Sequence, residues 1–88
     1  MTWKVEFDDA AAKELRKLDR RAQSEILRYL RERIATKENP RRFGKPLSGG
    51  LAGLWRYRVG NYRMICQIDN GKLLVLVVRV AHRKDAYK

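Results

Sequence analysis

Two dipeptides, Gly60-Asn61 and Asn70-Gly71, divide the C-terminal half of the sequence into three segments rich in strand-forming residues. Both dipeptides favour two-residue β-hairpin turns, and the second matches the type I′ turn, in which both central residues have positive φ. The segments that they separate span residues 54–59, 62–69 and 72–80. The sequence therefore predicts a three-stranded antiparallel meander.

The N-terminal half predicts one strand and two helices. Residues 3–7 alternate apolar and charged side chains, as a half-buried strand does. Asp8 or Asp9 can cap a short helix that ends near Asp19, and an apolar stripe predicts a second helix over about residues 20–35. Residues 36–50 contain both prolines, which predicts an irregular basic loop. We expect an α+β fold with a helical hairpin on one face of a four-stranded sheet.

The length and the cysteine content limit the kind of protein. An 88-residue chain has apolar material for one core, so residues 1–88 are expected to form a single domain. The single cysteine, Cys66, excludes an intramolecular disulfide and a thiolate zinc site, and its place among core residues predicts a buried, inert thiol. The chain shows no signal peptide and no apolar run long enough to span a bilayer, so we expect a cytoplasmic protein without a membrane partner.

The positive charge is concentrated in the second half. The formal net charge is +11, yet residues 1–40 carry ten Lys/Arg against eight Asp/Glu, whereas residues 41–88 carry eleven against two. This asymmetry predicts an anionic partner on the C-terminal half. Nucleic acid is the leading candidate, and an acidic protein or a membrane surface is the alternative.

The alternation of side chains along the strands predicts where the positive charges lie. In residues 54–59 the aromatic side chains point to one face, and Arg56 and Arg58 point to the other. If Gly60-Asn61 is a two-residue turn, Arg58 lies directly opposite Arg63. Two opposed guanidinium groups are destabilising by themselves, so an anion such as a phosphate is expected to bridge them.

Three segments carry a more specific pattern: Leu54-Trp55-Arg56-Tyr57-Arg58, Tyr62-Arg63-Met64-Ile65 and Val80-Ala81-His82-Arg83-Lys84-Asp85-Ala86-Tyr87. The pattern resembles the RelE branch of the RelE/ParE toxin superfamily, and the similarity extends over almost the whole chain. It implies a type II toxin that cleaves mRNA on the ribosome and is neutralised by an antitoxin. It puts Arg56 and Arg58 at basic positions of the family, Arg63 and Arg83 at its catalytic arginines, and Tyr87 at its C-terminal tyrosine.

A mechanism without metal or small-molecule cofactor follows, because RNA carries its own nucleophile, the 2′-OH. We expect Tyr87 to accept the 2′-OH proton and Arg83 to assist the departing 5′-oxygen, while the strand arginines neutralise the phosphate. The basic loop and the tail supply the residues expected to contact RNA, namely Arg41, Arg42, Lys45, His82 and Lys84. The expected partners are mRNA, the ribosome and an acidic RelB-like antitoxin.

Two other functions and one structural question stay open. A ParE-like toxin shares the fold but inhibits DNA gyrase. A non-catalytic RNA-binding domain would use Trp55, Tyr57 and Tyr62 as a stacking platform, which requires these rings to be exposed. The first strand joins the meander either at its edge or beside the strand of residues 72–80.

Overall fold

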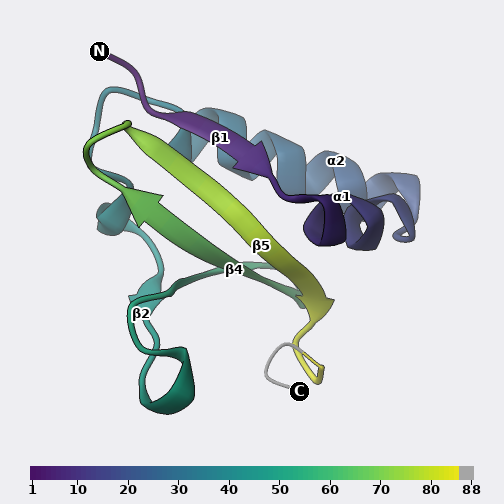
Figure 1. Cartoon of the computed structure of the whole chain (residues 1–88). Helices are drawn as coiled ribbons and strands as arrows, with labels where there is room; N and C mark the ends of the chain where they lie inside the picture. Colours follow the sequence, from purple (N-terminus) through teal and green to yellow (C-terminus); the bar gives the residue numbers. More distant parts are fainter. Residues whose placement is uncertain (86–88) are drawn as a thin grey trace.

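The computed structural model describes residues 1–85 of the chain. It forms a five-stranded sheet in the order β1-β5-β4-β3-β2, with two helices covering one face (Figure 1). The elements are β1 (Lys4–Phe7), α1 (Asp9–Arg16), α2 (Arg20–Tyr29), β2 (Lys45–Pro46), β3 (Trp55–Val59), β4 (Tyr62–Asp69) and β5 (Leu74–His82). The predicted α+β class, the helical hairpin and the meander are confirmed, whereas the predicted number of four strands is wrong.

Both helices begin at aspartate caps. The carboxylates of Asp8 and Asp19 each accept the backbone N–H three residues further on, at 2.8 Å. These bonds satisfy N–H groups that a helix N-terminus otherwise leaves unpaired. Helix α2 continues into a π-helical turn, Leu30–Ile34, which keeps both of its end residues buried against the sheet. The predicted second helix over residues 20–35 therefore corresponds to α2 and this turn.

The core lies between the helices and the sheet. Its buried members are Trp3, Ala11, Ile26, Leu30, Ile34, Tyr57, Met64, Cys66, Val75, Val77 and Val80. Tyr57 is fully buried, and its hydroxyl donates to the carbonyl oxygen of Pro40 at 2.7 Å. Cys66 is buried as predicted, and burial raises the pKa of its thiol to about 12, which disfavours the reactive thiolate. Within residues 1–85, no helix is long and apolar enough to cross a membrane.

Strand β1 lies at one edge of the sheet and pairs in parallel with β5. The register joins Lys4 to Leu74 and Phe7 to Val77, so β1 covers only the first four residues of β5. This placement answers the question that the sequence left open. It also leaves the second half of β5 beyond the reach of β1.

The fifth strand, β2, forms within the segment predicted to be an irregular loop. Lys45 pairs with Arg56 and Pro46 with Trp55 across an antiparallel ladder. Gly44 precedes this strand with a φ of 75°, and a Cβ at this position would clash with the carbonyl oxygen of Arg56. The loop prediction was wrong here because it relied on the local preference of proline and glycine for irregular structure. In the folded protein, Gly44 lets the chain approach β3 closely, and a proline is tolerated because β2 is an edge strand.

One of the two hairpin turns follows the prediction and the other does not. Val59 pairs with Tyr62, so Gly60-Asn61 is a two-residue turn. At the other hairpin Asp69 pairs with Leu74, which makes a four-residue loop instead of the predicted two-residue turn. Between the turn and the bulge at Ile65/Cys66, the two registers differ by two residues, which leaves the side chains of this part on the same face, so alternation does not distinguish them there. The Asp69 carboxylate accepts the N–H of Lys72 at 3.2 Å and stabilises the longer loop.

Candidate nucleic-acid interface

The turn between β3 and β4 brings together three of the predicted site residues. Arg58 lies directly opposite Arg63, as predicted, and its side chain is exposed. The backbone N–H of Arg83 donates to the carbonyl oxygen of Asn61 at 2.7 Å, so the chain that leaves β5 runs along the same turn. Figure 1 shows this turn and the C-terminal segment at one end of the sheet. Three arginines separated by up to 25 positions therefore meet there.

Strand β2 extends the positive charge across the sheet. Lys45 lies directly opposite Arg56, and residues that oppose each other in an antiparallel pair share a face. Arg56 in turn lies opposite Ile65, which is only 3% exposed although it is not part of the core cluster. Lys45 and Arg56 thus lie on the face of the sheet that points away from the helices, the face that also carries Arg58 and Arg63.

A pocket of about 260 Å³ opens beside this row of cations. It is lined by Tyr29, Phe43, Gly44, Lys45, Arg56 and Arg58. Strand β2 pairs only with Trp55 and Arg56, so the edge of β3 near Arg58 is not covered by β2, and the pocket opens there. The lining contains three cations and no carboxylate, which makes the pocket suited to an anion.

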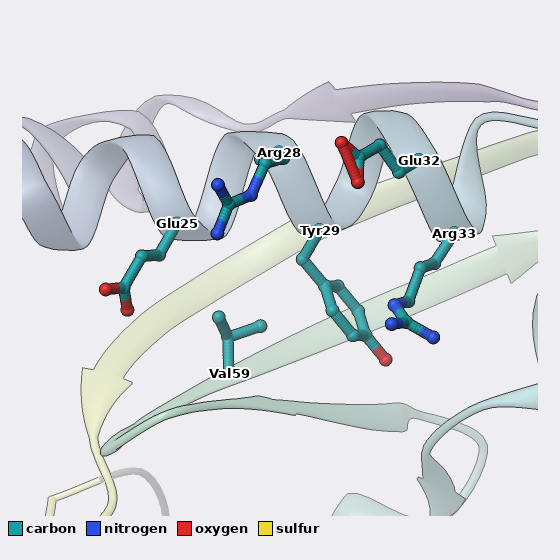
Figure 2. A pocket seen from close by; sticks show the side chains of 6 residues that line it. All are labelled: Glu25, Arg28, Tyr29, Glu32, Arg33 and Val59. Atoms are coloured by element: carbon teal, nitrogen blue, oxygen red, sulfur yellow. The ribbon is translucent and has the colours of Figure 1, made fainter.

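A second pocket, of about 390 Å³, lies between α2 and the end of β3 and has a different character (Figure 2). It is lined by Val59 of β3 and by five residues of α2 and the turn that follows it, namely Glu25, Arg28, Tyr29, Glu32 and Arg33. Two carboxylates and two guanidinium groups balance each other, so this pocket offers no net charge to an anion.

Tyr29 lines both pockets, and its position beside the cations makes its phenol a candidate proton acceptor. Burial raises its pKa, although Arg33 acts in the opposite direction. Burial also raises the pKa of Tyr57. Both phenols therefore stay protonated at neutral pH, and neither is suited to act as a general base.

The basic loop contributes less to this surface than the sequence suggested. Arg41 donates to the side-chain oxygen of Asn70 at 2.9 Å, at the far end of β4. Asn70 lies seven positions after Arg63 along the strand direction, which corresponds to roughly 23 Å. Arg42 places its guanidinium carbon 5.0 Å from the centre of the Phe43 ring. The structure thus brings Lys45 to the arginine row and leaves Arg41 at the opposite end of the sheet.

His82 lies on the face of the sheet that the helices cover, opposite to the arginine row. Its ring meets the Tyr62 ring edge-on at 5.8 Å, and its Nδ1 accepts the N–H of Lys84 at 3.3 Å. Tyr62 and His82 are paired and follow the buried Met64–Val80 pair, so both lie on the side of the helices. His82 therefore supports the start of the tail, whereas Lys84 is exposed. The remaining predicted residue, Tyr87, lies outside the described residues 1–85.

The aromatic residues of the meander do not form an open stacking platform. Tyr57 is fully buried, and Trp55 and Tyr62 are half-buried. The indole N–H of Trp55 donates to the carbonyl oxygen of Phe43 at 2.7 Å. Their arrangement corresponds to the core-facing role expected for them.

Two residues near the site were missed by the sequence analysis, Glu14 and Arg79. The Glu14 carboxylate accepts the N–H of Val80 at 2.8 Å and lies 3.9 Å from Nε of Arg79. Arg79 also donates to the carbonyl oxygen of Asp85 at 2.8 Å. The only sequence signal was a lone arginine inside an apolar strand, whose partner on α1 is 65 positions away.

Comparison with known proteins now identifies the family. The family model described as "ParE toxin of type II toxin-antitoxin system, parDE" matches residues 5–87. The chain belongs to the RelE/ParE toxin family. Toxin RelG of Mycobacterium tuberculosis is 34% identical to this RelE/ParE toxin over 88 residues, which cover 100% of this chain and 99% of RelG. Toxin RelE of the same organism is 31% identical over 84 residues, which cover 96% and 84% of the two chains.

Solved structures of the family show the same fold. The toxin–antitoxin complex RelBE2 from Mycobacterium tuberculosis contains a chain that matches with a TM-score of 0.85 and 33% identity, covering 97% of this chain and 95% of that one. The isolated Escherichia coli RelE toxin matches with a TM-score of 0.71 at 22% identity, over 91% and 83%. This chain is thus a type II toxin with two helices on a five-stranded sheet.

Proposed function

We propose that this RelE/ParE-family toxin is a ribosome-dependent mRNA endonuclease that cleaves by attack of the substrate's own 2′-OH. The observation that carries the proposal is the opposition of Arg58 and Arg63 across one hairpin, with Arg83 beside the same turn. Like charges so placed destabilise the sheet, whereas a bound phosphate accepts hydrogen bonds from several guanidinium groups at once. Lys45 and Arg56 continue the row along the backbone of a bound RNA strand.

The proposed chemistry assigns one task to each group. Arg56, Arg58 and Arg63 neutralise the charge that develops on the phosphate, and Arg83 assists the departing 5′-oxygen. The arginines do not act as the base, because a guanidinium stays protonated. The raised pKa values of Tyr29 and Tyr57 disfavour those phenols as well. From the resemblance to the RelE branch we assign the 2′-OH proton to the phenolate form of Tyr87, four positions after Arg83. The departing 5′-oxygen takes a proton from water, so the expected products are a 2′,3′-cyclic phosphate and a 5′-OH.

An acidic RelB-like antitoxin is the partner that we propose for this toxin. The relatives with solved structures include toxin–antitoxin complexes from Mycobacterium tuberculosis and Pyrococcus horikoshii. The exposed cations on residues 41–85 outnumber the nearby carboxylates, so an acidic segment laid over them gains complementary charge. Binding there would cover the proposed phosphate site, and its association rate is expected to fall as salt is added.

The decisive experiment adds the purified toxin to programmed ribosomes with an mRNA in the A site. We expect cleavage that leaves a 2′,3′-cyclic phosphate and that stops when the nucleotide 5′ of the cut carries a 2′-deoxyribose. Tyr87→Phe retains the ring and removes the proton acceptor, so it should bind ribosomes normally and cleave far more slowly. Cleavage of the 2′-deoxy substrate at the normal rate would refute the proposed attack.

The family model's description favours testing one alternative, a ParE-like toxin that inhibits gyrase. A gyrase supercoiling reaction with the same protein preparation separates the two. Inhibition of supercoiling without cleavage of mRNA on the ribosome would replace the endonuclease proposal. Purely RNA-binding activity is disfavoured by the burial of Tyr57 and by the packing of Trp55 and Tyr62.

A further inference from the structure

The end of β5 changes its surroundings at Val78. Strand β1 pairs with Leu74–Val77 only, so from Val78 onward one side of β5 has no neighbouring strand among the described residues. At the same point β5 contains one extra residue relative to β4, because Ile65 pairs with Arg79 and Cys66 with Val77. A bulge of this kind redirects the side chains next to it. Arg79 lies immediately after this irregularity.

Helix α1 takes over the role of the missing strand. The Glu14 carboxylate accepts the N–H of Val80 at 2.8 Å with one oxygen and lies 3.9 Å from Nε of Arg79 with the other. The two side chains are only 31% and 34% exposed, so their attraction is screened less than that of a pair in open water. Glu14 thus forms an ion pair with Arg79 while it accepts the N–H of the next residue, Val80.

Arg79 in turn holds the start of the tail. Its Nη2 donates to the carbonyl oxygen of Asp85 at 2.8 Å. Between these residues the chain forms a turn, in which the N–H of Asp85 donates to the carbonyl oxygen of His82 at 2.7 Å. Arg83, inside this turn, is attached to Asn61 through its own N–H. The turn is therefore anchored at its beginning by the β3–β4 hairpin and at its end by Arg79.

We propose that Arg79 is a positioning residue, oriented by Glu14, that holds the tail turn so that Arg83 is directed at the phosphate site formed by Arg58 and Arg63. The proposal rests on the proposed endonuclease function. It gives Arg79 a role different from that of the other arginines on the sheet, since its guanidinium contacts a carboxylate and a backbone carbonyl of the protein. Substrate binding by the remaining cations does not require it.

Three variants test this role. Arg79→Met retains the aliphatic part of the side chain and removes the donor, Arg79→Lys retains a cation that reaches one acceptor, and Arg20→Met removes the same charge at an exposed position on α2. A hydrogen bond from a charged donor corresponds to a rate effect of about tenfold or more. We therefore expect Arg79→Met to lower kcat about tenfold with KM for the programmed ribosome within about twofold of wild type, because only the tail is released.

The comparison of variants gives the signature of positioning. Arg79→Lys should recover part of the lost kcat, and Arg20→Met should match wild type. Backbone order parameters of residues 83–85 provide a readout that does not depend on cleavage. In Arg79→Met they should fall from the rigid range to the flexible range, below about 0.6, while the values in β3 and β4 stay unchanged.

The outcomes separate the two proposals. If wild-type protein does not cleave mRNA, the endonuclease proposal fails, and the order parameters still test whether Arg79 holds the turn. Rigid residues 83–85 in Arg79→Met overturn the positioning role even if the wild type is an active nuclease. A flexible turn with unchanged kcat would also overturn it, because Arg83 would then reach the phosphate without the anchor.

Discussion

Substitution of Gly44 by alanine tests how β2 is held against β3. The glycine has a φ of 75°, where an L-residue costs about 1–2 kcal/mol. An added Cβ would lie 2.7 Å from Nε1 of Trp55 and 2.9 Å from Cδ1 of Tyr57, and would also clash with the carbonyl of Arg56. Because these neighbours are backbone and packed rings, relieving the clash should cost about 1–3 kcal/mol more. We expect Gly44→Ala to lower the free energy of unfolding by about 3 kcal/mol.

Two glycines in the next loop serve as matched controls. Gly49 has a φ of 63° and open space around an added Cβ, so Gly49→Ala measures the backbone cost alone, about 1 kcal/mol. Gly50 has open space as well and no positive φ, so Gly50→Ala should change stability by less than about 0.5 kcal/mol. Urea unfolding followed by tryptophan fluorescence compares the three variants.

The expected difference between Gly44→Ala and Gly49→Ala is large enough to measure by urea unfolding. With a slope near 1 kcal/mol per molar urea, typical of a small domain, the midpoint of Gly44→Ala should lie about 2 M below that of Gly49→Ala. Loss of β2 would also move Lys45 away from Arg56, so RNA cleavage should weaken in the proposed assay. Equal midpoints for Gly44→Ala and Gly49→Ala would refute the reasoning, because the tight contact with β3 would then contribute nothing to stability.

Two further predictions concern the arginine pair and the buried thiol. Arg58→Gln removes one of two opposed guanidinium groups, so it should raise the free energy of unfolding by about 0.5 kcal/mol, measured in urea. The same change removes a phosphate ligand and should lower kcat/KM for cleavage about tenfold or more. A lower free energy of unfolding would contradict the repulsion. The Cys66 thiol is fully buried and its pKa is raised to about 12, so a thiol reagent at pH 8 should label it only after denaturation, and rapid labelling of the native protein would argue against the buried placement.

Much of the fold and part of the site were determined by local signals in the sequence. The aspartates before the first helix, the apolar stripe of the second and the alternation of residues 54–59 depend on neighbours within a few positions, and they predicted α1, α2 and β3 correctly. The Gly60-Asn61 turn determined the opposition of Arg58 and Arg63, because a two-residue turn leaves one register. The excess of cations in the second half was sufficient by itself to indicate an anion-binding surface.

The tertiary structure decided whatever depends on contacts between distant residues. The bond from Arg41 to Asn70 joins positions 29 apart, and the bond from Val80 to Glu14 joins positions 66 apart, so neither appears in a local pattern. Strand β2 needed the close approach of Gly44 to β3, and the register of β5 depended on a four-residue loop and on a bulge that local alternation does not reveal. Alternation and propensity report which way a side chain points, whereas only packing determines which partner it meets.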